Sequence, residues 1–176
     1  MFILCISLQV LTAAAGGGGA PLFILNEDDS HFYFSRTAED MSQAGLEAWV
    51  DQYAGTKVTH LFLCPNAMRA SYNSAVWDPI WDLRGQNAPP DGDSLWNWMN
   101  NARLLSERNL DPYAVWIARS REKGLSPWLT MRMNDVHNVD DPGNILHSTF
   151  WVQHPEFRRV PENPEGWVDR AFDYLH

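Results

Sequence analysis

The sequence has little cysteine, few basic residues and no apolar run long enough to span a membrane comfortably, and each shortage argues against a class of protein. One of the two cysteines, Cys5, lies in a segment that we expect to be removed, so Cys64 is left alone and allows no internal disulfide. Because Cys64 closes an apolar run, a buried and inert thiol is favoured over a nucleophile. The net charge is −9, which disfavours nucleic acid and anionic membranes as partners, since phosphate contacts need clustered Lys and Arg.

The first twenty residues differ from the rest of the chain. Residues 2–15 are apolar and uncharged and end in three alanines, which resembles a secretory signal peptide cleaved near Ala15 or Ala20, although a positively charged start is missing. The run is too short for a comfortable membrane span. We therefore expect a signal peptide and glycine-rich joint over residues 1–20, a domain over residues 21–176, and a secreted or periplasmic bacterial protein. A remnant of a longer upstream chain, or a misassigned start, is the alternative.

Three apolar runs in the remaining chain are typical of buried strands. They cover residues 22–25, 58–64 and 125–133, and each ends abruptly in polar residues. An apolar run followed by packed polar side chains is expected where the carboxyl end of a parallel strand opens into a ligand site. The overall composition, 45% apolar and 20% charged, is that of an ordinary globular domain. Nine tryptophans are many for this length, and we expect most of them to pack in the core.

Helical patterns alternate with these strands. Thr37 and Asp40 form a capping box, and Asp111-Pro112 is the preferred start of another helix, while residues 163–164 begin a last one. The apolar faces that we expect are Leu46, Trp49, Val50 and Tyr53; Leu95, Trp98, Met99 and Ala102; Tyr113, Trp116, Ile117 and Ser120; and Val168, Ala171, Phe172 and Leu175. Alternation of this kind implies parallel strands with right-handed crossovers.

The connections between these elements are strongly unequal. Long loops over residues 66–93 and 134–163 follow strands, whereas the returns from helix to strand, residues 54–57 and Gly124, are short. An elaborate face at the carboxyl ends of the strands and a plain opposite face are typical of a TIM-type barrel. We therefore predict an α/β fold, the amino-terminal part (about three β/α units) of a (β/α)8 barrel, because a complete barrel needs about 250 residues.

The residues of the two long loops resemble those of a known protein family. Residues 22–176 resemble the start of glycosyl-hydrolase-like (β/α)8 proteins, the family 10-like group of secreted bacterial proteins. The residues that carry it are 59–72 (THLFLCPNAMRASY) with Val76-Trp77-Asp78, then 132–141 (RMNDVHNVDD), His147-Ser148, Phe150-Trp151 and His154-Pro155-Glu156. The resemblance implies carbohydrate hydrolysis outside the cytoplasm, with no cofactor. In many such barrels the acid/base and the nucleophile lie on the fourth and later strands, which this chain lacks, so the resemblance names no catalytic residue here.

Polar and aromatic side chains in the two long loops are the candidates for substrate binding. They are Asn66, Arg69, Tyr72, Trp77, Arg132, Asn134, His137 and Trp151. Donors and acceptors suit hydroxyl-rich substrates, Arg132 could hold a carboxylate or an acidic sugar, and a flat indole suits the apolar face of a sugar ring. If the third strand continues, Arg132 and Asn134 face the same way and Asp135 faces the other.

Structural roles compete with these assignments. Asn134 and His137 could belong to a polar network that ties down the loop, and for Asp135 a turn-capping role is favoured. A loop arginine such as Arg69 is more often a structural contact, and the loop tryptophans, including Trp81, could simply fold their loops onto the body. Glu27 is better explained as part of an acidic turn than as half of a catalytic pair, because glycosidases need two carboxylates roughly 5 to 9 Å apart.

Two other functions stay open. A metal-dependent hydrolase or deacetylase could draw its ligands from the acidic and histidine residues at the strand ends, although no diagnostic metal-binding spacing occurs. The candidate ligands are Asp28, Asp29, His31, Asp135, His137, Asp140 and Asp141. The third possibility is a non-catalytic carbohydrate-binding protein on the same scaffold.

Overall fold

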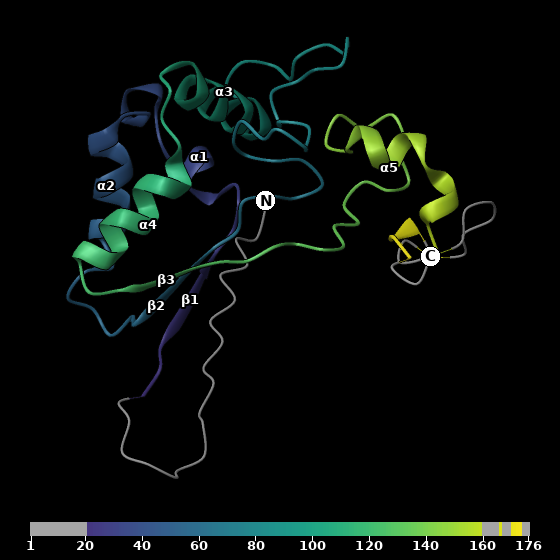
Figure 1. The fold of residues 1–176 in the computed structure, drawn as a ribbon. Coiled ribbons are helices and arrows are strands. Elements are labelled where there is room, and N and C mark those ends of the chain that lie inside the picture. Colours follow the sequence, from purple (N-terminus) through teal and green to yellow (C-terminus); the bar gives the residue numbers. More distant parts are fainter. Residues whose placement is uncertain (1–20, 160–165, 167–169, 174–176) are drawn as a thin grey trace.

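The chain folds around a small parallel sheet (Figure 1). The computed structural model describes residues 21–159, 166 and 170–173, so the predicted signal peptide and joint at residues 1–20 lie outside the described residues. Strands β1 (Ile24–Glu27), β2 (His60–Leu63) and β3 (Ser126–Leu129) lie side by side in chain order, and both pairs are parallel. Glu27 is opposite Leu63, which is opposite Leu129, so the carboxyl ends of all three strands lie at one edge. The predicted mixed α/β class and parallel pairing are confirmed.

Helices α2 (Gln43–Asp51) and α4 (Pro112–Glu122) pack together beside the sheet, where α4 contacts β3 (Figure 1). Helices α1 (His31–Ser35) and α3 (Ser94–Glu107) pack on each other next to them. Leu61 and Leu63 alternate with Phe62 on β2 and are buried in the core, whereas Phe62 is only partly buried, as the two-residue period of a strand requires. Aromatic rings fill the space between helices, with Trp49 of α2 and Trp116 of α4 only 4.6 Å apart between centroids. Core packing is therefore confirmed for these tryptophans.

The predicted cap of α4 is confirmed, whereas α2 begins later than predicted and is capped by Ser42, whose side chain accepts from Gly45 N. A short 3-10 helix, Ala38–Asp40, carries the Thr37–Asp40 capping box. The Asp111 carboxylate accepts hydrogen bonds from Tyr113 N and Ala114 N at the start of α4. The sequence interpretation missed α1, because five residues are too few to display a helical period.

The strand bounds differ from the apolar runs, and β2 and β3 are shorter than predicted. β1 lies two residues later than predicted, β2 loses two residues at its start and one at its end, and β3 ends at Leu129 instead of continuing to residue 133. The expectation that Arg132 and Asn134 share one face of β3 is therefore wrong, because the segment after Leu129 leaves the sheet. Among the described residues the sheet has three strands and does not close into a barrel.

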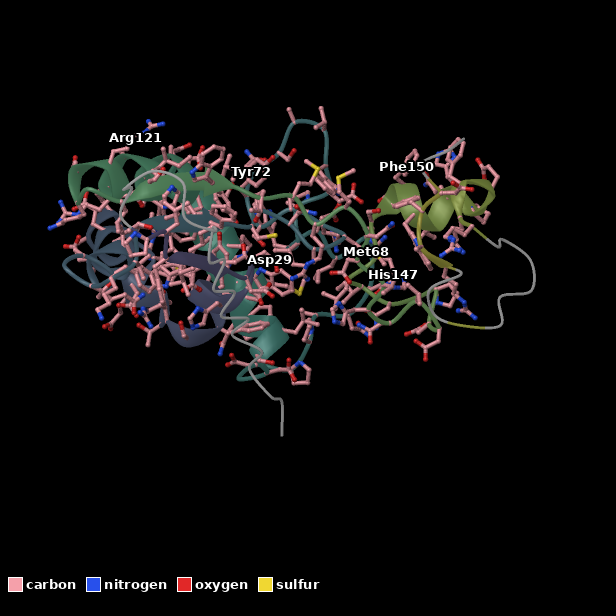
Figure 2. All side chains as sticks on the ribbon, turned by 90° about the horizontal axis from the view of Figure 1, so that it is seen from below. Asp29, Met68, Tyr72, Arg121, His147 and Phe150 are labelled. Atoms are coloured by element: carbon pink, nitrogen blue, oxygen red, sulfur yellow. The ribbon has the colours of Figure 1, made fainter. Side chains whose placement is uncertain are left out.

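The segment after β3 leads to a second, smaller cluster beside the sheet (Figure 1). It carries α5 (Thr149–Gln153) and the 3-10 helix Pro155–Phe157, where the sequence predicted an unbroken loop. Trp151 packs with Met68 and Val139. Figure 2 shows Met68 and His147 where the sheet-bearing part of the chain meets this segment. The predicted last helix from residue 163 falls largely outside the described residues, of which Phe172 forms an isolated antiparallel bridge with Arg158.

The described part of the chain contains no helix that is long and apolar enough to cross a membrane. On the sheet side opposite the helices, Trp128 remains 56% exposed and its ring lies 6.2 Å from that of Phe62. One face of the sheet thus contributes to the core, and the other stays largely open to solvent.

Candidate functional site

Asn66 joins the two long loops at the carboxyl edge of the sheet. Its Nδ2 donates to the carbonyl oxygens of Ala67 at 2.6 Å and Arg132 at 2.9 Å, and its Oδ1 accepts from Arg132 N at 3.2 Å. The predicted meeting of the loops after β2 and β3 is therefore what the structure shows. Asn66 is fully buried, so its amide acts on the backbone, and its predicted contact with a substrate stays a prediction.

Arg132 connects the ends of β1 and β3 through two ion pairs. Its Nη2 lies 2.9 Å from Asp28 Oδ2 and its Nη1 lies 3.0 Å from Asp135 Oδ2. Partial burial favours the neutral forms of both carboxyls, yet their pKa values are lowered, because hydrogen bonds, including those from the Arg132 guanidinium, stabilise the carboxylates. The guanidinium is thus largely neutralised by two carboxylates, which weakens its pull on a free anion.

Asp29 lies beneath this network, between the sheet and the helices. Its side chain is almost completely buried, and burial together with the hydrogen bond and the charge of Asp28 raises its pKa well above the ordinary range. Of these two neighbouring carboxyls, Asp29 therefore keeps its proton to a higher pH than Asp28 does. Figure 2 places Asp29 in the middle of the molecule, where a substrate has no direct access.

Asp135 also holds the imidazole of His137. Its Oδ1 accepts from His137 N at 2.9 Å and lies 2.6 Å from His137 Nδ1. The Asp135 side chain is 4% exposed and that of His137 is 76% exposed. The predicted turn cap is confirmed by the backbone bond, and the same carboxylate also orients a solvent-facing imidazole ring.

A pocket opens beside this network, and we call it the rim pocket. Its volume is about 270 Å³. Its lining includes Met68, Val76, Trp77, Arg132, Met133, Asp135 and Phe150. Trp77 is anchored by a 2.8 Å hydrogen bond from Nε1 to the Met68 carbonyl. Apolar and aromatic walls with one ion pair at the edge provide a surface for a ligand that has both apolar faces and polar substituents.

Other predicted residues lie outside the rim pocket. Arg69 is fully buried, and its terminal nitrogens donate to the carbonyls of Ile145, Pro79 and Asp82. Tyr72 lines a different hollow near the start of α4, and Asn134, although exposed, accepts from Phe172 N at 3.0 Å. These contacts hold loops in place, and the predicted roles in substrate binding stay predictions.

Trp151 is the predicted residue whose position differs most from a sugar platform. It is 1% exposed, its Nε1 donates to the Arg170 carbonyl at 3.0 Å, and the Arg158 guanidinium lies 3.6 Å above its ring. The His147 ring lies 4.2 Å from it. The ring is thus buried among side chains of this chain, and its predicted role as a sugar platform stays a prediction.

Sequence reasoning missed two features of this region. Glu27, the last residue of β1, is buried and hydrogen bonded to His31 and Tyr53, and no local pattern in the sequence indicated these contacts. The apolar wall made by Met133 and Phe150 was also missed. These two residues are far apart in the chain, and no local pattern shows that they come together. Within residues 21–159, 166 and 170–173, no group of three or more His, Cys, Asp or Glu could hold a metal ion.

The chain matches no protein-family model and none of the curated proteins with which it was compared. The candidate site therefore rests on geometry alone.

Proposed function

We propose that this chain is the amino-terminal part of a glycoside-hydrolase-like (β/α)8 barrel that binds a poly- or oligosaccharide at the carboxyl edge of its strands. The observation that carries the proposal is the rim pocket, in which Trp77 and the apolar side chains of Met133 and Phe150 face the Arg132–Asp135 ion pair. Sugar rings need such a combination, because their C–H faces stack on aromatic and apolar surfaces while their hydroxyls need donors and acceptors.

The barrel part of the proposal is supported by the sheet. The strands are parallel and in chain order, and the connections that leave the carboxyl ends of β2 and β3 are the long ones. Ligand sites of α/β barrels occupy this edge. The open sheet face with the exposed Trp128 is the side that would be enclosed by later strands.

Hydrolysis, in this proposal, depends on carboxylates outside the described network. Asp28 and Asp135 are both ion-paired with Arg132, and Asp29 is buried below them. Because a glycosidase needs one free acid and one free base or nucleophile across the scissile bond, these three aspartates are better suited to holding the rim than to cleaving a glycoside.

Binding of soluble oligosaccharides tests the proposal. The purified chain is titrated with a panel of neutral and acidic oligosaccharides, and binding is followed by calorimetry. We expect Trp77→Ala to weaken binding about five- to tenfold, because an aromatic contact contributes about 1 kcal/mol. Arg121→Ala, on the exposed surface of α4 away from the rim (Figure 2), is the matched control and should leave affinity unchanged.

Two results would overturn the proposal. One is the absence of binding for every member of the panel at millimolar concentration. The other is an equal loss of affinity in Trp77→Ala and Arg121→Ala, which would place the binding surface elsewhere. Release of reducing sugar by the chain without further strands would contradict the assignment of the catalytic carboxylates, and binding without release is the expected result.

A further inference from the structure

The Asp135–His137 pair is a carboxylate–imidazole dyad. Asp135 is held on both sides, because Oδ2 binds Arg132 at 3.0 Å while Oδ1 lies 2.6 Å from His137 Nδ1. Arg132 is in turn fixed by its 2.9 Å contact with Asp28 and by the Asn66 bonds to its backbone. The carboxylate therefore rests on residues from the ends of all three strands.

The ionisation of Asp135 decides which nitrogen of His137 carries the proton. Although burial favours the neutral acid, the pKa of Asp135 is lowered by hydrogen bonds from His137 and Arg132, so this group is a carboxylate and can only accept. Nδ1 of His137 must then be the donor, and in the neutral ring Nε2 keeps its lone pair. Since the side chain is 76% exposed, Nε2 is available to a ligand.

Asp135 also lines the rim pocket, so the carboxylate of the dyad lies at the edge of the proposed binding surface. We infer that Asp135 is a positioning residue that holds His137 with its proton on Nδ1, and that Nε2 accepts a hydrogen bond from a hydroxyl group of the bound ligand. Naming a sugar hydroxyl as the donor rests on the proposed function, whereas the fixed acceptor nitrogen does not.

A second histidine provides an internal comparison. His154 Nδ1 lies 2.9 Å from Glu156 Oε1, but that glutamate is 58% exposed, and the His154 ring lies 4.6 Å from the Phe150 ring. The two pairs share the two-residue spacing and differ in the burial of the carboxylate and in the Arg132 contact. If the buried, Arg132-bound carboxylate fixes the ring tautomer, removing the carboxylate should change the reactivity of His137 much more than that of His154.

Diethyl pyrocarbonate, which acylates an unprotonated imidazole nitrogen, is the probe. The native chain is labelled briefly at neutral pH, and the rate at each histidine is read by peptide mass spectrometry. We expect His137 to react fastest and to slow roughly fivefold or more in Asp135→Asn, because a carboxylate accepts only from Nδ1–H and leaves the lone pair on Nε2, whereas an amide can also donate to Nδ1. Glu156→Gln, the matched variant, should change His154 by much less.

Tautomer measurement on the unmodified chain guards against misfolding of the variant. Nitrogen-15 shifts of the His137 ring are expected to show the proton on Nδ1. A ring protonated on Nε2, or a His137 rate that is unchanged in a folded Asp135→Asn variant, would overturn the dyad. Failure of sugar binding with a reactive, Nδ1-protonated His137 would instead overturn the proposed function and leave the dyad in place.

Discussion

Asn66 and Arg132, 66 residues apart in the chain, are joined by a pair of hydrogen bonds between the Asn66 amide and the Arg132 backbone, at 2.9 and 3.2 Å. This pairing continues the contact between β2 and β3 after the strands have ended. It also determines where the Arg132 guanidinium lies, and so the positions of the Arg132 ion pairs with Asp28 and Asp135.

Removal of the Asn66 amide should destabilise the protein. Asn66→Ala leaves the backbone N–H and C=O of Arg132 without these partners in a buried place, and we expect the free energy of unfolding to fall by about 2–3 kcal/mol. Urea denaturation measures it. Asn73→Ala, on the exposed surface of the same loop, is the control and should change stability by less than about 0.5 kcal/mol. Equal effects would mean that the Asn66 pairing adds no stability.

Asp29→Asn should change the pH dependence of stability. Because the pKa of Asp29 is raised by burial and by Asp28, the folded state keeps a proton that the unfolded chain releases above about pH 4. The free energy of unfolding of the wild type therefore falls as the pH rises from there toward the raised pKa. An asparagine keeps a donor for Asp28 and does not titrate. The free energy of unfolding of the variant, measured relative to that of the wild type, should therefore be higher at pH 7 than at pH 5.

Asp28 acts with the opposite sign and must be separated from this effect. Its lowered pKa stabilises the folded state above the ordinary range of an aspartate, and that contribution is lost as the pH falls. Denaturant curves collected from pH 5 to pH 8 avoid this acid region. Parallel wild-type and Asp29→Asn stability profiles over that window would show that Asp29 is not protonated in the folded protein.

Trp151→Ala should act on stability rather than on sugar binding. The truncation removes a ring that is 1% exposed and leaves the Arg158 guanidinium without its aromatic partner, which costs about 3–5 kcal/mol. Proteolysis of the segment around α5 is expected to become faster. A folded variant of normal protease resistance that has lost only sugar affinity would restore the predicted role of Trp151 as a platform.

Gly45→Ala should destabilise the protein although alanine is the better helix former. A Cβ at Gly45 in α2 would overlap the backbone carbonyl of Asp40, so the turn before the helix would have to move. We expect a loss of about 2 kcal/mol or more in place of the usual gain of about 1 kcal/mol. Ala48→Gly, on the exposed side of the same helix, should lose about 1 kcal/mol. Unchanged or increased stability of Gly45→Ala would show that the turn moves freely.

Local patterns were sufficient for the three strands and for α2, α3 and α4, but not for the short helices α1 and α5. The Thr37–Asp40 capping box, the Asp111 cap and the apolar faces of α2, α3 and α4 depend on residues within one or two turns of each other. Parallel pairing followed from the helices between the strands. The ends of the strands were misjudged, because an apolar residue such as Met131 or Met133 continues the pattern whether or not a partner strand lies beside it.

The composition of the candidate site depended on the tertiary structure. The sequence by itself determined that polar residues follow the strands and that the two long loops meet at one edge. Only the folded chain decided that Arg69 and Trp151 are buried, that Arg132 binds Asp28 and Asp135, and that Met133 and Phe150 face Trp77. The physical reason is distance along the chain: caps and periods are local, whereas burial and ion pairing depend on which remote segments the packing brings together.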